Sequence, residues 1–171
     1  MKITATQPAG DSLVASIYEN PDYLDCFVAA VGPDTFERVD DVATAWFMGQ
    51  PAWLRLLSTN TLSKGAVEDA IARGYRVGDT VGSWEIITRN DEEIVFGENM
   101  GFMQYRMSFR LPSAGDRIEA GTAVRFLWHR TGKFYFALVQ PLHPRFVKMV
   151  LKNTIARSNT RPPKAPSDTC E

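Results

Sequence analysis

The chain has 171 residues, a formal net charge of −1, and 44% hydrophobic and 23% charged residues. This length and composition fit one globular domain with a core of its own. The near-neutral charge excludes a protein whose whole surface is built for nucleic acid, because such binding uses many Lys and Arg side chains, and we expect no nucleic-acid partner.

The first twelve residues lack the apolar core of a secretory signal, and no later run has the roughly 18 apolar residues of a membrane span. We therefore expect a cytoplasmic protein without a membrane span. Cys26 lies in an apolar stretch and Cys170 in a polar tail, so a disulfide or a CxxC-type metal site is not expected. We expect no metal and no cofactor.

The first third of the chain is expected to hold a loose arm over residues 1–20, a strand over 23–31 and a helix that begins at Asp34. Glu37 stands in capping-box position for that helix. Its apolar residues form one stripe: Phe36, Val39, Ala43, Trp46 and Phe47.

Two more helices are expected before the sheet, one opened by Pro51 and one over residues 63–73. The apolar side of the first consists of Trp53, Leu54, Leu56 and Leu57. Five strands are then expected in a meander, with Asn90-Asp91 and Thr131-Gly132 as turns. Their ranges are 83–89, 93–98, 102–111, 121–130 and 133–140.

Strict alternation over residues 103–111 predicts a half-buried strand with one wet face. Its apolar face holds Met103, Tyr105, Met107, Phe109 and Leu111. The predicted hairpin over 121–140 is apolar on both faces, so a homodimer partner is one candidate for covering it.

A final amphipathic helix is expected from Pro144 to Arg157, with its apolar stripe against the sheet. The domain is expected to span residues 21–157. Residues 158–171 are expected to form a disordered tail. Six basic residues and no acidic one lie between Arg145 and Lys164. A solvated helix face explains them, and contact with anions or acidic lipids is the alternative.

No catalytic or metal-binding motif stands out. His129 and His143 lack metal-ligand spacing, and His143 is expected to anchor a loop or flank a helix N-cap. The carboxylates at 91–93 and Glu98 bracket one strand, but alternation puts Glu93 and Glu98 on different faces, which argues against an acid/base pair.

Several stretches read together carry a family resemblance: Pro51–Leu57, Val77–Asp79, Glu93–Asn99, Gly132–Tyr135 and Val139–His143. They resemble a bacterial family of domains of unknown function that is similar to the START-like, or SRPBCC, superfamily. The resemblance implies an α+β helix-grip fold, a curved antiparallel sheet wrapped around a long C-terminal helix, and a cavity. It implies no particular activity.

The sequence thus favours a protein that binds a small apolar or amphipathic molecule between the sheet and the last helix. Tyr105, Glu98 and His129 are expected to orient that molecule. The other expected lining residues are Trp84, Met103, Met107, Phe109, Phe126, Phe136 and Val147.

Three alternatives stay open. In the first, the apolar side chains simply fill a core, since protein interiors are normally packed without voids. In the second, the protein is an enzyme of the cyclase or aromatase type, in which Tyr105, His129 or His143 moves protons. In the third, it is an interaction domain without a ligand that dimerises through residues 121–140.

Overall fold

A computed structural model describes residues 2–51 and 64–158. Within these residues one antiparallel sheet has the strand order β1-β2-β7-β6-β5-β4-β3. The strands are β1 (Ile3–Thr6), β2 (Tyr23–Ala30), β3 (Thr80–Val81), β4 (Trp84–Arg89), β5 (Glu93–Asn99), β6 (Met103–Arg110) and β7 (Arg117–Phe126). The helices are α1 (Leu13–Ser16), α2 (Val39–Gly49), α4 (Lys64–Arg73), α5 (His129–Val139) and α6 (His143–Ser158).

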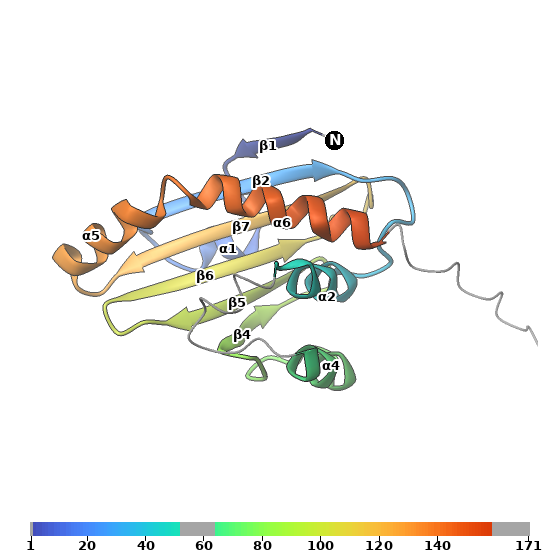
Figure 1. Ribbon diagram of the computed structural model, residues 1–171, viewed down its shortest axis with the longest axis horizontal. Coiled ribbons are helices and arrows are strands. Elements are labelled where there is room, and N and C mark those ends of the chain that lie inside the picture. The colour runs from blue at the N-terminus through green and yellow to red at the C-terminus, as the bar shows by residue number, and fades with distance from the viewer. Residues whose placement is uncertain (1, 52–63, 159–171) are drawn as a thin grey trace, which may run out of the picture.

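The predicted fold class is confirmed: a curved antiparallel sheet carries a long last helix, consistent with a helix-grip fold. α6 runs along β2 and β7 on one face of the sheet (Figure 1). Its apolar stripe is buried at Val147, Val150 and Leu151, as the 3.6-residue period predicts. α2 packs against α6, where Asn153 donates a hydrogen bond to the carbonyl of Gly49 at 2.9 Å.

The first three strands of the predicted meander are confirmed as β4 to β6. The fourth, predicted over 121–130, is confirmed as β7 only up to Phe126, and the fifth is wrong. Residues 133–140 lie mostly in α5, and Thr131-Gly132 lies inside that helix instead of forming a turn. A nearly continuous apolar run satisfies both the strand period and the helix period, so the pattern alone did not distinguish a strand from a helix here. Gly132 allows α5 to pack closely on β7, because an added Cβ would lie 2.7 Å from the Phe126 ring.

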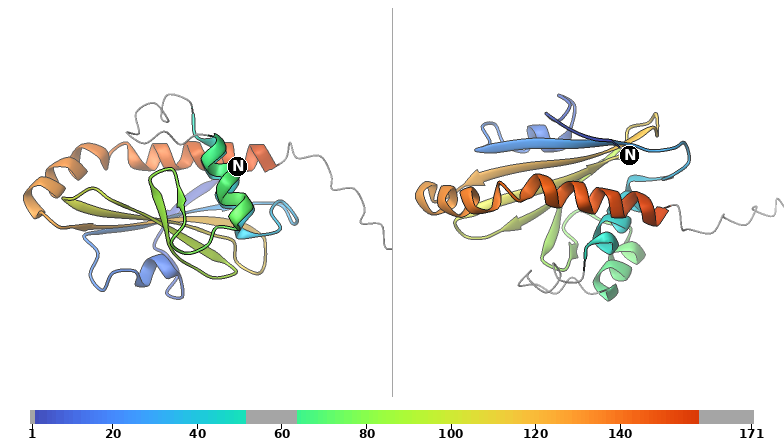
Figure 2. Two further views of the ribbon diagram at one scale, coloured as in Figure 1. Left: turned by 90° about the horizontal axis from the view of Figure 1, so that it is seen from below. Right: turned by 45° about the horizontal axis from the view of Figure 1, so that its top comes forward.

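The face of the sheet opposite α6 carries α1 (Figure 2). The sequence predicts a loose arm over 1–20, whereas residues 3–6 pair with β2 and residues 13–16 form α1. Glu93 holds α1: it accepts hydrogen bonds from the Ser12 hydroxyl (2.9 Å) and from the backbone N–H groups of Leu13 (2.7 Å) and Val14 (3.2 Å).

This packing also corrects the expectation of a wet sheet face. Ser108 and Arg110 on that face of β6 are buried. Arg110 is held in part by Asp11, to which it donates two hydrogen bonds of 3.0 and 2.7 Å. At Gly121 an added Cβ would lie 2.6 Å from Val14, so α1 approaches the sheet as closely as a glycine permits.

The helix expected from Asp34 begins at Val39 instead. Asp34 has a positive φ of 61°, which a helix does not tolerate, and the side chain of Asp41 accepts a hydrogen bond from the N–H of Arg38 at 3.2 Å. The predicted stripe is still buried, and Trp46 and Phe47 pack on Phe109 and Phe96 in the core. The predicted helix at Pro51, with its four apolar residues, and the tail lie outside the described residues.

We predict that Glu93→Ala lowers the free energy of unfolding by about 1–3 kcal/mol, because it leaves buried donors of α1 without an acceptor. Urea denaturation measures this, and Glu85→Ala, at an exposed position of β4, is the matched control with a change within about 0.5 kcal/mol. Equal effects of the two substitutions would contradict the role given to Glu93.

Candidate functional site

Polar side chains from three strands meet on the sheet face beneath the start of α6. Alternation along β2 places Tyr23 and Asp25 on the same face as Phe27. Asp25 lies opposite Thr122 of β7 in the strand register. Tyr105 reaches the same place from β6, and His143, the first residue of α6, reaches it from above. We call these five residues the polar cluster: Tyr23, Asp25, Tyr105, Thr122 and His143.

The members of the polar cluster are joined through Asp25 and Thr122. Nε2 of His143 lies 3.3 Å from Oδ2 of Asp25 and 3.3 Å from the hydroxyl of Thr122. The Tyr23 hydroxyl donates to the same Asp25 oxygen at 2.5 Å. Thr122 also lies close enough to Tyr105 to lower the pKa of that phenol. The Asp25–His143 contact is an ion pair when the imidazole is protonated and a hydrogen bond when it is neutral.

One oxygen of this cluster is left over. Oδ1 of Asp25 is buried and has no hydrogen-bond partner within the part of the chain that the structure describes. A buried acceptor without a donor costs roughly 1–3 kcal/mol, so proteins rarely keep one without a use. The geometry therefore offers a place for a hydroxyl or amino group that donates a hydrogen bond to Asp25.

Both tyrosines are held in their protonated form. Burial, with Asp25 as the next cause, raises the pKa of Tyr23 well above its ordinary value. Burial also raises the pKa of Tyr105, and the nearby Thr122 side chain offsets part of that rise. Each phenol therefore remains neutral and able to donate at any physiological pH.

Apolar rings enclose the polar cluster on two sides. The ring of Tyr23 lies 4.8 Å from that of Phe136 and 6.0 Å from the imidazole of His143, measured between centroids. The ring of Phe27 lies 6.1 Å from His143 on the other side. A carboxylate and an imidazole in such surroundings are poorly hydrated, which strengthens their electrostatic interactions.

A groove of about 470 Å³ leads to this cluster from the edge of the sheet. We call it the edge groove; it lies between the end of β1, β2 and the first turns of α6. Lys148 lies at this groove with its ammonium 5.8 Å from the centre of the Phe27 ring. The other lining residues are Ala5, Thr6, Gln7, Tyr23, Leu24, Asp25 and Pro144. Its volume is in the range of sites that take small molecules.

The site residues predicted from the sequence fall mostly on the same sheet face but not in one group. Trp84 and Tyr105 are in contact at 5.5 Å between ring centroids, and Glu98 pairs with Tyr105 across β5 and β6. Met103, Phe126 and Phe136 form one cluster beside Tyr105. Met107, Phe109 and Val147 belong to the main core.

His129 is separated from the other predicted orienting residues. Its side chain is 67% exposed, and its nearest charged partner is Asp22 at 3.8 Å. His143, expected to anchor a loop or flank a helix N-cap, is the first residue of α6 and a buried member of the polar cluster.

Sequence reasoning missed Tyr23, Asp25 and Thr122. The available signal was Asp25 itself, a carboxylate in the middle of an apolar strand.

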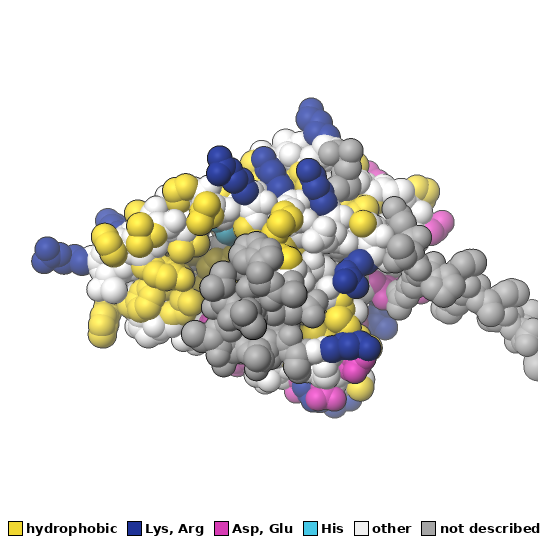
Figure 3. Space-filling model, viewed as in Figure 1, with side chains coloured by type: hydrophobic (Ala, Val, Ile, Leu, Met, Phe, Trp, Pro, Cys, Tyr) yellow, Lys and Arg dark blue, Asp and Glu magenta, His cyan; other side chains and the backbone are white. Residues whose placement is uncertain are grey.

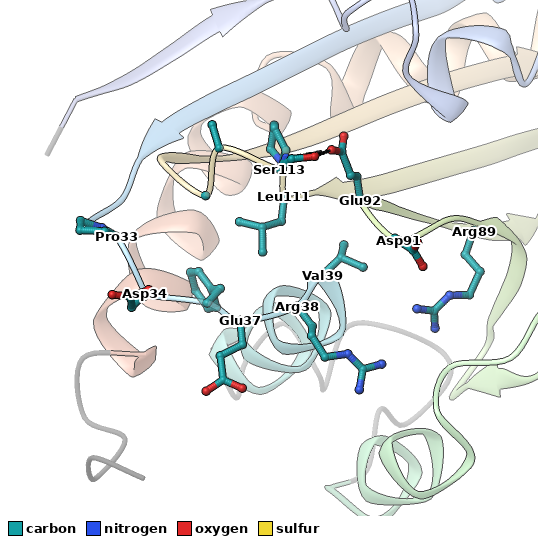
Figure 4. A pocket seen from close by; sticks show the side chains of 14 residues that line it. Pro33, Asp34, Glu37, Arg38, Val39, Arg89, Asp91, Glu92, Leu111 and Ser113 are labelled. Carbon is teal, nitrogen blue, oxygen red and sulfur yellow. Dashed lines mark hydrogen bonds between the residues drawn. The ribbon is translucent and has the colours of Figure 1, made fainter. Parts of the chain in front are cut away.

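A second hollow, of about 680 Å³, lies between the start of α2, the β4–β5 turn and the loop after β6 (Figure 4). Two of its charged residues are paired: Glu92 accepts from Ser113 and Arg110, and Arg89 donates to Asp40 at 2.8 Å. No group of three or more metal-ligating side chains occurs among residues 2–51 and 64–158.

A model of the family described as "Protein of unknown function (DUF2867)" matches residues 17–150. Because this is well over half of the 171 residues, the chain belongs to that family. The matched region contains all five residues of the polar cluster. No curated protein and no solved structure matches the chain. None of the described helices is long and apolar enough to span a membrane.

We predict that Tyr23→Phe lowers the free energy of unfolding by about 1–3 kcal/mol, because it removes the shorter of the two polar contacts of a buried carboxylate oxygen. Tyr18→Phe is the matched control: the Tyr18 hydroxyl is buried and has no partner among the described residues, so its removal is neutral or stabilising. Chemical denaturation measures the free energy of unfolding of both variants. A decrease in Tyr18→Phe alone would contradict the role given to the Tyr23 hydroxyl.

The raised tyrosine pKa values also predict a pH dependence. Above pH about 10 the unfolded chain releases tyrosine protons that the folded chain keeps at Tyr23 and Tyr105, so the unfolded state binds fewer protons. The free energy of unfolding therefore falls as pH rises above about 10, and it falls less steeply in the Tyr23→Phe, Tyr105→Phe double variant. Denaturation midpoints between pH 9 and 11 measure this, and parallel curves for the two proteins would refute it.

Proposed function

We propose that the protein binds a small amphipathic molecule between its sheet and the start of α6. The polar end of this molecule carries a hydroxyl or amino group that donates to Oδ1 of Asp25, and its apolar body lies in the edge groove. The observation that carries the proposal is the buried, unpartnered oxygen of Asp25, which lies beside the paired groups of Tyr23, Thr122 and His143.

The proposal requires that donors and acceptors be available together. The Tyr23 O–H already donates to Oδ2 of Asp25, so the neutral Tyr105 phenol and the Thr122 hydroxyl are the groups that can complete the hydrogen bonds of one hydroxyl or amine. Phe27 and Pro144 supply apolar contact along the groove. A few placed polar groups in apolar surroundings are what small-molecule sites use for orientation.

The order of elements supports a place in the START-like superfamily as part of this proposal. β2 precedes α2 and α4 and pairs with β7, the meander follows these two helices, and the last helix lies over the sheet. The proposed ligand site also includes Trp84, Glu98 and Met103, which neighbour Tyr105. The cytoplasm remains the proposed location.

A chain-matched series tests the proposal: 1-octanol, octylamine and octanoate share one tail and differ in the head group. We expect isothermal titration calorimetry to show octanol and octylamine binding at least about tenfold more tightly than octanoate, because a carboxylate would face Asp25. Native mass spectrometry of the purified protein, read for a co-purifying apolar molecule, gives a second and independent reading.

Asp25→Asn is the diagnostic variant, since it keeps the shape and removes the negative charge. We expect it to lose the preference for octylamine over octanoate, while Asp91→Asn, in the second hollow, keeps it. No binding of any of the three compounds, or the same preference in Asp25→Asn, would overturn the proposal.

The contact of His143 with Asp25 favours a second candidate, an enzyme of the cyclase or aromatase type. In that case the imidazole moves a proton and Asp25 orients it, while a pocket holds the reacting chain. Turnover of a bound molecule that is lost in His143→Gln, with binding retained, would favour this candidate over a carrier.

A further inference from the structure

A set of large apolar side chains is exposed on α5 and its flanks. Its members, Leu127, Trp128, Phe134, Tyr135, Leu138 and Leu142, are each between 37% and 71% exposed, and we call this surface the α5 apolar face. Phe134 and Leu138 lie four residues apart on α5, so they share one side of the helix, and Leu142 lies in the turn between α5 and α6. Single exposed apolar residues are common, but a contiguous set marks an interaction surface.

Positive charge surrounds this face. Residues 120–158 contain seven Lys and Arg residues and no Asp or Glu. Arg130 and Lys133 are exposed on α5 itself, and Arg145 and Lys152 are exposed on α6. Figure 3 shows the yellow patch at the α5 end of the molecule with dark blue side chains at its tip and along the α6 edge, while the magenta ones gather toward the opposite end.

We propose that the α5 apolar face docks on the surface of an anionic lipid bilayer. Trp, Phe and Leu side chains on one side of a helix, with Lys and Arg beside them, are the pattern of helices that lie in the membrane interface. Trp128 and Tyr135 suit the head-group region, because each has an apolar ring and a polar group. Arg130 and Lys133 pair with lipid phosphates and carboxylates while the apolar side chains enter the acyl boundary.

Charge decides between a bilayer and a second copy of this chain. A symmetric dimer through this face would set the basic side chains of one copy against those of the other, and like charges at an interface are unfavourable. Among the described residues, Asp22 is the acidic residue that lies within ion-pair distance of α5. Its carboxylate is 3.8 Å from His129 of its own chain. An anionic surface, in contrast, neutralises the same basic groups.

The position of α5 connects this surface with the polar cluster without depending on the proposed ligand. Phe136, on the buried side of α5, contacts Tyr23 and also packs on Phe126. α5 leads within four residues to His143. A membrane-bound α5 therefore brings the polar cluster close to the lipid surface.

Vesicle flotation with the full chain tests the proposal. We expect the protein to float with vesicles of phosphatidylcholine and 30% phosphatidylserine, not with phosphatidylcholine alone, and to be released as salt rises, because exposed charges are screened. Each basic residue near such a surface contributes about 1 kcal/mol, so Arg130→Glu with Lys133→Glu weakens binding at least about tenfold. Trp128→Ser with Phe134→Ser is expected to abolish it.

Arg76→Glu with Val77→Ser is the matched control, since it removes one exposed base and one exposed apolar residue far from α5 along the chain. Circular dichroism confirms that each variant is folded. Equal flotation of wild type and the α5 variants would overturn the proposal. A wild-type dimer in light scattering that Phe134→Ser dissociates, with no vesicle binding, would assign the face to a second copy instead. These outcomes are independent of whether octylamine binds.

Discussion

The packing of α6 along β2 and β7 is the contact on which the rest of the structure depends. Val147, Val150 and Leu151 are buried there, and the same helix gives α2 its packing surface at Gly49. Because α6 starts at His143, burying its apolar stripe also sets the imidazole on Asp25 and Thr122. The helix that closes the core thus completes the polar cluster, and the edge groove exists because its first turns lie beside β2.

Two buried carboxylates show how the same physical rule leads to different roles. Glu93, on the α1 face, has donors for both of its oxygens and holds an element of the fold. Asp25, on the α6 face, has one oxygen with two polar neighbours and one with none among the described residues. Full pairing indicates a structural role. An acceptor left unpaired next to a groove indicates a place where another molecule completes the bonding.

Sequence periodicity predicted the parts of the fold in which one period clearly dominates. Residues 103–110 alternate strictly and are β6, and Phe146 to Ile155 follow the helix period and lie in α6. It failed for Lys133–Val139, where apolar residues occupy nearly every position, and for α1, whose four residues are too few to show a period. The polar cluster was not predictable because it depends on strand register: Asp25 meets Thr122 across 97 positions of sequence only once β2 pairs with β7.

The central claim is that Asp25 and its neighbours form the polar end of a ligand site. The most direct measurement is the change in the ¹³Cγ shift of Asp25 and the imidazole ¹⁵N shifts of His143 when octylamine is added to labelled protein. The account predicts that these two residues and Thr122 show the largest changes in the chain and that the changes saturate. Saturating changes centred instead on the second hollow, around Arg38 and Glu92, or the absence of any saturating change, would contradict it.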